Sequence, residues 1–108
     1  MLFFGTAGIP ITTPKRSSVN GIKRVRELGL DAMELEFVYG VKMSENLAQK
    51  IKMVAKKENV YLTAHAPYYI NLNSLKKETV QASIDRILKT ARTTKIAGGN
   101  SITLHVAS

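Results

Sequence analysis

The sequence predicts an α/β fold in which strands and helices alternate as β-α-β-α-β-α-β, the N-terminal half of a TIM (β/α)₈ barrel with parallel strands. Three observations support this prediction. Apolar runs alternate with amphipathic helical stretches, in units of about 30 to 40 residues. Within the later strands, apolar and polar residues also alternate. Finally, the two histidines of the chain, His65 and His105, both end a predicted strand on its polar side.

The first unit begins with the apolar run LFFGT, which Gly5 ends, and continues through a loop rich in Gly, Pro, Thr and Ser. Ser17 or Ser18 can cap the first helix, because a serine side chain accepts a hydrogen bond from the first turn. Gly29 is the expected stop of that helix. Ser44 is the corresponding cap of the second helix. The later strands are expected at residues 31–38, 60–65 and 101–106.

Each helix is predicted to carry an apolar face, since apolar residues recur three or four positions apart. The residues of these faces are Val19, Ile22, Val25 and Leu28; then Leu47, Ile51, Val54 and Ala55; and, in a longer third helix that ends before Gly98, Val80, Ile84, Ile87, Leu88 and Ala91.

The pattern of the strands selects a barrel among α/β folds. Strands buried on both faces should be nearly continuous apolar runs. Here Met33, Leu35 and Phe37 share one face of the second strand, whereas Glu34 and Glu36 share the other. In a barrel, the helices cover the outer face and alternate residues point into the lumen. An α+β sheet with one face in water would alternate in the same way, but it would not explain why both histidines end strands.

The composition favours a polyanionic partner. Sixteen Lys and Arg against eight Asp and Glu give a net charge of +8, which favours nucleic acid; a solvated basic surface is the alternative. The absence of Cys excludes a disulfide framework and a thiolate metal site. No apolar run approaches the ~20 residues that span a bilayer, and the start lacks a signal peptide pattern. We therefore expect no membrane association and a cytoplasmic location.

The length fits half a barrel. Complete (β/α)₈ barrels take about 250 residues, and this chain has 108. We expect residues 1–108 to be the N-terminal part of a single barrel domain, truncated after the fourth strand. The first and fourth strands would then lack their partners, so we expect self-association through unpaired barrel edges.

The paired histidines predict a metal site. His65 and His105 end consecutive strands, and adjacent parallel strands lie about 4.8 Å apart, so the two imidazoles could converge on one or two ions. Zinc suits neutral imidazole. A single histidine at such a position is more often structural, but the matched placement of two favours metal binding. Glu34 and Glu36 share the polar face; we interpret them as interior hydrogen-bonding groups, with Glu36 also a possible ligand.

The stretch HAPYYINLN, residues 65–73, resembles the pattern H-x-x-Y-x-I-N-L of the endonuclease IV family, the AP endonuclease family 2 of the xylose-isomerase-like barrels. ITLHVAS resembles the next strand of that family, which ends in a second histidine. The order and spacing of elements match over all 108 residues. The resemblance implies that His65 and His105 are zinc ligands, in a site of up to three ions whose carboxylates would lie beyond Ser108; catalytic residues within this chain remain unknown.

The resemblance also implies a set of DNA contacts. Tyr68 would be the aromatic residue inserted into damaged DNA, with Tyr69 beside it in the same loop. Lys42, in the stretch FVYGVKMS, is a candidate phosphate contact and Tyr39 a weaker one. Asn71 would fix the loop through hydrogen bonds to nearby backbone.

The leading interpretation is therefore a zinc-dependent AP endonuclease that hydrolyses DNA at abasic sites, with this chain inactive alone. Two alternatives stay open. A metal-dependent sugar isomerase or epimerase of the same superfamily would give Glu36 more importance. A non-catalytic α/β module that binds nucleic acid would leave both histidines without metal.

Overall fold

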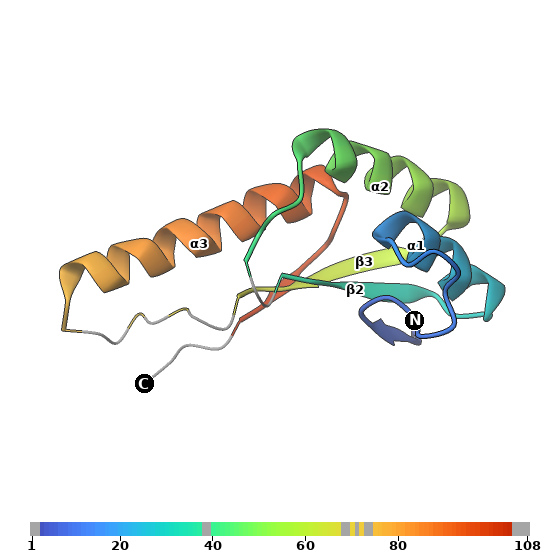
Figure 1. The fold of residues 1–108 in the computed structure, drawn as a ribbon, viewed down its shortest axis with the longest axis horizontal. Coiled ribbons are helices and arrows are strands. Elements are labelled where there is room, and N and C mark those ends of the chain that lie inside the picture. The colour runs from blue at the N-terminus through green and yellow to red at the C-terminus, as the bar shows by residue number, and fades with distance from the viewer. Residues whose placement is uncertain (1–2, 38–39, 68–69, 71, 73–74, 105–108) are drawn as a thin grey trace.

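The computed structural model describes residues 3–37, 40–67, 70, 72 and 75–104. Strands and helices alternate along these residues (Figure 1). Their bounds are β1 Gly5–Ala7, α1 Ser18–Glu27, β2 Ala32–Glu36, α2 Glu45–Glu58, β3 Tyr61–His65, α3 Lys77–Ile96 and β4 Ile102–Thr103. The strands form one sheet in the order β1-β2-β3-β4, and each neighbouring pair is parallel. The predicted α/β order is thus confirmed.

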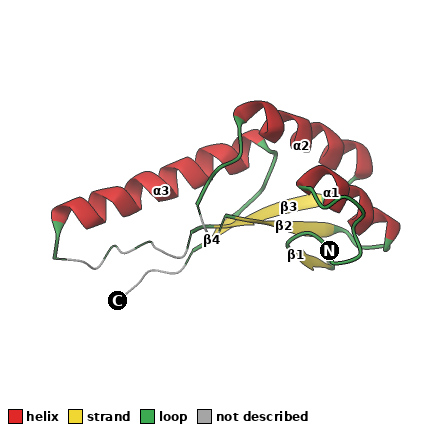
Figure 2. Cartoon of the chain, in the orientation of Figure 1, coloured by secondary structure: helices red, strands yellow, loops and turns green. Residues whose placement is uncertain are grey.

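All three helices lie on the same side of the sheet (Figure 2). The core forms between them and the apolar face of β2 and β3; its buried residues are Ile22, Val25, Met33, Leu35, Phe37, Val41, Ala48, Ile51, Ala55, Val60, Leu62, Ala64 and Ala97. We call the opposite side of these strands the open face; it carries Glu34, Glu36, Tyr61, Thr63 and His65. The alternation predicted for these two strands is therefore confirmed.

Serine caps fix the starts of the first two helices. The Ser17 hydroxyl accepts a hydrogen bond from the Asn20 amide at 3.1 Å, and Ser44 accepts one from the Leu47 amide at 3.1 Å. Past the end of α1, Gly29 has a φ of +76°, a conformation that favours glycine. These local signals behave as the sequence predicts, because each depends on groups within one turn of helix.

The first strand differs from the prediction. β1 begins at Gly5 instead of ending there. Gly5 faces Ala32 across the β1–β2 pair, and a Cβ on Gly5 would lie 2.3 Å from the Ala32 carbonyl oxygen. Glycine is thus needed where two backbones approach closely, within the strand and not at its end.

The third helix also differs from the prediction. Its buried residues are Ser83, Thr90 and Thr94, whereas Ile84 and Leu88 of the predicted apolar face are 38% and 51% exposed. The buried hydroxyl of Thr90 donates to the Arg86 carbonyl at 2.7 Å, which offsets the cost of burying it. Outside α3, two further predicted core positions, Leu28 and Leu47, are exposed.

The last strand is short. β4 covers Ile102–Thr103, within the predicted 101–106, and pairs with the carboxyl half of β3. The expected end of this strand at His105 lies outside the described residues. A search of the described helices finds none that is both long and apolar enough to span a membrane.

Candidate functional site

The carboxyl ends of β2 and β3 bring Glu36 and His65 together. The two residues face each other in the parallel register, and each is the last residue of its strand. The amide of Phe37 donates to the His65 carbonyl at 2.9 Å, which ties the two strand ends together. In α/β barrels the carboxyl ends of the strands carry the reactive groups, so this pair marks the candidate site.

His65 is half-buried and its ring orientation is fixed by the backbone. Its Nδ1 lies 2.7 Å from the Ala66 carbonyl oxygen. Because a carbonyl oxygen can only accept, Nδ1 is the donor in this hydrogen bond. A hydrogen bond of this kind from the second ring nitrogen is typical of metal-binding histidines, since it sets the tautomer and orients the ring.

Glu36 is an acid whose proton affinity is raised. Partial burial of its carboxyl, followed by the hydrogen bond and negative charge of Glu34, raises the pKa of Glu36 from 4.5 to about 7, although the nearby His65 acts to lower it. A carboxyl group with this pKa exchanges its proton near neutral pH, as general acids and bases do.

The chain is firmly anchored directly after His65. The Ala66 amide donates to the Thr103 carbonyl at 2.8 Å, and the side chains of Ala66, Pro67 and Ile70 are buried. The predicted DNA contacts Tyr68 and Tyr69 belong to the same stretch but lie outside the described residues. Their roles stay predictions, as do those of Asn71 and Tyr39, which lie outside as well.

Lys42 lies in the segment between β2 and α2 and is exposed. The preceding Val41 is 7% exposed and belongs to the core, so the backbone at Lys42 is anchored while its side chain reaches solvent. This arrangement is compatible with a phosphate contact, and the contact itself stays a prediction.

The predicted metal site is only partly covered by the described residues. Within the ranges that the structure describes, no group of three or more His, Cys, Asp or Glu side chains could hold an ion. His65 supplies an imidazole of the kind that binds zinc, and Glu36 faces it in the register. His105 lies outside the described residues, so the predicted convergence of the two imidazoles stays a prediction.

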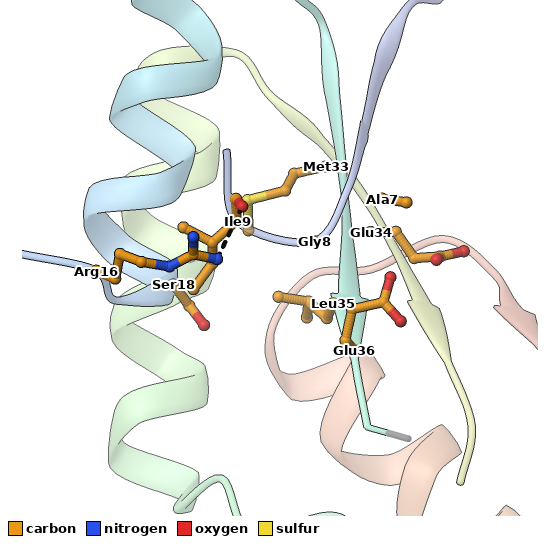
Figure 3. Close-up of a pocket in the computed structure, with 9 residues that line it drawn as sticks. All are labelled: Ala7, Gly8, Ile9, Arg16, Ser18, Met33, Glu34, Leu35 and Glu36. Atoms are coloured by element: carbon orange, nitrogen blue, oxygen red, sulfur yellow. Dashed lines mark hydrogen bonds between the residues drawn. The ribbon is translucent and has the colours of Figure 1, made fainter. Parts of the chain in front are cut away.

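A cavity of about 300 Å³ opens next to Glu36 (Figure 3). It lies where β1 leaves the sheet and is lined by Ala7, Gly8, Ile9, Arg16, Ser18, Met33, Glu34, Leu35 and Glu36. In Figure 3, Arg16 and Ser18 lie on the helix side of β2, whereas Glu34 and Glu36 point to the other side.

The pattern of the sequence does not predict this cavity. The sequence predicts a loop rich in Gly, Pro, Thr and Ser at this place, and Gly8 belongs to it. Gly8 has a φ of +89°, and a Cβ there would lie 3.2 Å from Cγ of Glu36. One signal in the sequence could have indicated the cavity. It is a glycine a few residues after a predicted strand, opposite a polar residue of the next strand.

Comparison with known proteins agrees with this geometry. Residues 22–108 match a protein family described as a xylose isomerase-like TIM barrel. The chain belongs to this family. It is also 46% identical over 102 residues to the uncharacterised protein MJ0133 of Methanocaldococcus jannaschii, an alignment that covers 94% of this chain and 36% of that protein. The chain thus spans about a third of the length of this relative.

Two solved structures of known proteins share the fold of this family member. Endonuclease IV from Thermus thermophilus superimposes with a TM-score of 0.76 at 15% identity, over 96% of this chain and 40% of that one. An L-ribulose 3-epimerase superimposes with a TM-score of 0.78 at 12% identity, over 100% of this chain and 37% of that one. At these identities the likeness shows the fold alone. One of the two proteins is an endonuclease and the other is a sugar epimerase.

Proposed function

We propose that this chain belongs to a zinc-dependent endonuclease that hydrolyses phosphodiester bonds at abasic sites in DNA. The observation that carries the proposal is the placement of His65, at the carboxyl end of β3, on the open face, with Nδ1 donating to a backbone carbonyl. Sequence adds the Tyr68 and INL pattern directly after it. The likeness to endonuclease IV is consistent with the proposal.

In this proposal, His65 and His105 hold zinc together with ligands that this chain does not contain. Bound zinc lowers the pKa of a coordinated water to near neutrality and stabilises negative charge on a phosphate. The hydrogen bond to Ala66 orients the His65 ring, and in this proposal Nε2 would be the ligand atom. Glu36, which faces His65 in the register, holds or releases a proton beside it.

The DNA would be held by charge and by one inserted ring. The net charge of +8 supplies a salt-dependent attraction that does not depend on sequence, and Lys42 would contact a phosphate. Tyr68 would insert into the base stack where a base is missing, because the lesion lowers the cost of unstacking.

A change at Tyr68 tests the DNA part of the proposal. We expect Tyr68→Ala to weaken binding to a duplex with one abasic site by about 1–3 kcal/mol, the size of one stacking contact. Binding to the intact duplex of the same sequence should change much less, since phosphate contacts dominate there. Fluorescence anisotropy at one fixed salt concentration measures both affinities. Equal affinity of Tyr68→Ala and the parent chain for the abasic duplex would contradict the proposal.

Glu36 favours a second candidate function. A carboxyl group with a pKa of about 7 suits proton abstraction next to a carbonyl, the chemistry of a metal-dependent sugar isomerase or epimerase. This candidate predicts that the protein with its metal exchanges a ketose C–H proton with solvent D₂O, as NMR would detect, and that it binds abasic and intact duplexes equally. The endonuclease proposal predicts the reverse on both measurements.

We also propose that the chain self-associates. β1 and β4 are the two edges of the sheet, and parallel edges with unpaired backbone groups favour association. Two copies, each with four strands, could pair β1 of one with β4 of the other. Light scattering at tens of micromolar concentration should show a dimer or larger species, and a clean monomer would contradict this.

A further inference from the structure

The third helix, α3, exposes large apolar side chains and buries small hydroxyl residues. Its buried residues are Ser83, Thr90 and Thr94, whereas Ile84 and Leu88 are 38% and 51% exposed. The reverse arrangement would remove more apolar area from water within one copy of the chain. Apolar residues that gather on one exposed stripe, rather than singly, are typical of contact surfaces.

The exposed residues of α3 follow a heptad pattern. Six exposed positions alternate in steps of four and three residues, which places them on one stripe of the helix. The middle three are apolar, and the two ends are lysines. We call these six residues the α3 seam: Lys77, Gln81, Ile84, Leu88, Ala91 and Lys95.

The helix that carries the seam extends beyond its neighbours. It has 20 residues and is therefore about 30 Å long. Along the long axis of the molecule, its first half lies beyond the start of α2 (Figure 1). The described residues thus leave the α3 seam accessible, and the surface that it offers is one helix wide. A surface of this shape fits another helix.

One flank of the α3 seam carries charges of both signs. Glu78, Asp85 and Arg92 are spaced seven residues apart, so they lie on the same side of the seam. Acidic residues thus stand in the first half of this flank and a basic residue in the second. Asp85 accepts a hydrogen bond from Gln81 at 3.1 Å, but neither Asp85 nor Arg92 forms an ion pair with the residues that the structure describes. Both charges are therefore available to a helix that runs in the opposite direction.

We propose that the α3 seam is the contact surface for the α3 seam of a second copy of this chain, with the two helices antiparallel. In this arrangement Asp85 of each copy lies beside Arg92 of the other, which forms two equivalent ion pairs across a two-fold axis. Leu88 of each copy packs against Ala91 of the other, near the axis. The apolar centre contributes the affinity, and the charges set the direction and the register.

The charges disfavour the other ways to pair two such helices. A parallel pair places each residue opposite its own copy, so the lysines at the two ends of the seam, Lys77 and Lys95, repel their copies. An antiparallel pair shifted by about one turn places the two Asp85 carboxylates together. The proposed contact uses neither sheet edge, so it is separate from the pairing of β1 with β4, and it needs neither zinc nor DNA.

Leu88→Lys removes the centre of the contact. We expect the dissociation constant of the α3 contact to rise at least about hundredfold, because two leucines leave the interface and two charges enter it. Met53→Lys is the matched control, since Met53 is 73% exposed but belongs to α2; it should change the constant less than about twofold. Sedimentation velocity over a series of concentrations measures the association, and circular dichroism checks the fold. A monomeric parent, or association that is equally strong in Leu88→Lys and the parent, would overturn the proposal.

Charge reversal tests the direction of the two helices. Asp85→Arg alone and Arg92→Asp alone should each raise the dissociation constant about tenfold, because each creates two like-charge pairs. The double variant restores both ion pairs with the signs exchanged and should return the constant to within about threefold of the parent. Lys57→Asp on α2 makes the same charge change as Arg92→Asp away from the seam and should have little effect. A double variant as weak as the two single changes combined would overturn the proposal.

Cross-linking tests the register of the two helices. The chain has no cysteine, so each cysteine that is introduced is the only one in its chain. A mixture of Leu88→Cys and Ala91→Cys chains should form mixed disulfides faster than either variant forms disulfides with itself, because positions 88 and 91 of the two copies face each other. A preference for links between two Leu88→Cys chains, as in a parallel pair, or no preference at all, as in pairing through the sheet edges, would overturn the proposal.

Discussion

At the amino end of β3, Tyr61 stacks on Phe3 with ring centroids 4.9 Å apart, whereas at the carboxyl end of the same strand His65 lies beside Glu36. Both ends belong to the open face of one short strand. One end joins aromatic rings, and the other joins an imidazole to an acid with a raised pKa. The same strand thus carries a packed aromatic pair at one end and, at the other, the imidazole and acid on which the proposed chemistry depends.

The amino end is further held by Arg26. Its Nε donates to the Glu58 carbonyl at 2.9 Å and a terminal nitrogen donates to the Asn59 carbonyl at 2.6 Å, while another terminal nitrogen lies 3.7 Å from Asp31. Arg26, which belongs to α1, thus connects the carboxyl end of α2 with Asp31, the residue before β2. In barrel enzymes the amino ends of the strands contribute stability and the carboxyl ends contribute activity. The bonds of Arg26 belong to the amino end.

The largest expected effect on stability is at Arg26. Arg26→Ala should lower the free energy of unfolding by about 2 kcal/mol, because two carbonyls of the helix end lose a charged donor and the side chain is only partly exposed. The matched control is Arg24→Ala. Arg24 forms a long ion pair with Glu27, at 4.0 Å, and an exposed hydrogen bond to the Thr12 hydroxyl, so its loss should cost only about 0.5 kcal/mol. Urea denaturation followed by circular dichroism compares the two variants. Equal losses would contradict the role of Arg26 at the amino end.

The aromatic pair should have a smaller effect. A double-mutant cycle with Phe3→Ala and Tyr61→Ala should give a coupling energy of about 0.5–1.5 kcal/mol, the range for stacked rings. The cycle is needed because each ring also buries apolar area of its own. A coupling energy of zero would mean that the stack contributes nothing to the amino end.

Glu36 should show a pH dependence of the opposite kind to that of a stabilising carboxylate. Because its pKa is raised from 4.5 to about 7, the folded chain holds the proton more tightly, so its contribution falls as pH rises from about 4.5 to 7. Glu36→Gln mimics the protonated acid. Its melting temperature should therefore exceed that of the parent at about pH 8, with the difference disappearing near about pH 4; an equal difference at both pH values would contradict the raised pKa.

Much of the sheet could be predicted because its signals are local. The caps at Ser17 and Ser44 and the alternation in β2 depend on neighbouring residues only. The same alternation placed Glu36 and His65 on one face, and the family resemblance supplied the interpretation of His65 as a ligand. The order of elements then follows from right-handed crossovers between parallel strands.

Features that depend on tertiary contacts could not be predicted in this way. In α3, the periodicity predicts an apolar face that includes Leu88, but the face with Thr90 and Thr94 is the buried one. The chain packs closely there, since a Cβ on Gly99 would lie 2.5 Å from the Thr94 side chain. The cavity likewise depends on the path of a loop around Gly8 and Arg16, which no periodicity describes.

The central claim is that the carboxyl end of β3 binds metal and the amino end does not. The direct test is the zinc affinity of His65→Ala and Tyr61→Ala, measured by competition with a chromophoric chelator. Both changes truncate a ring on the open face of one strand. His65→Ala should lower zinc affinity at least about tenfold, because even the loss of a residue that hydrogen-bonds a metal ligand lowers metal affinity about ten- to hundred-fold. Tyr61→Ala should leave zinc affinity unchanged. Full zinc affinity in His65→Ala, or equal losses in the two variants, would contradict the claim.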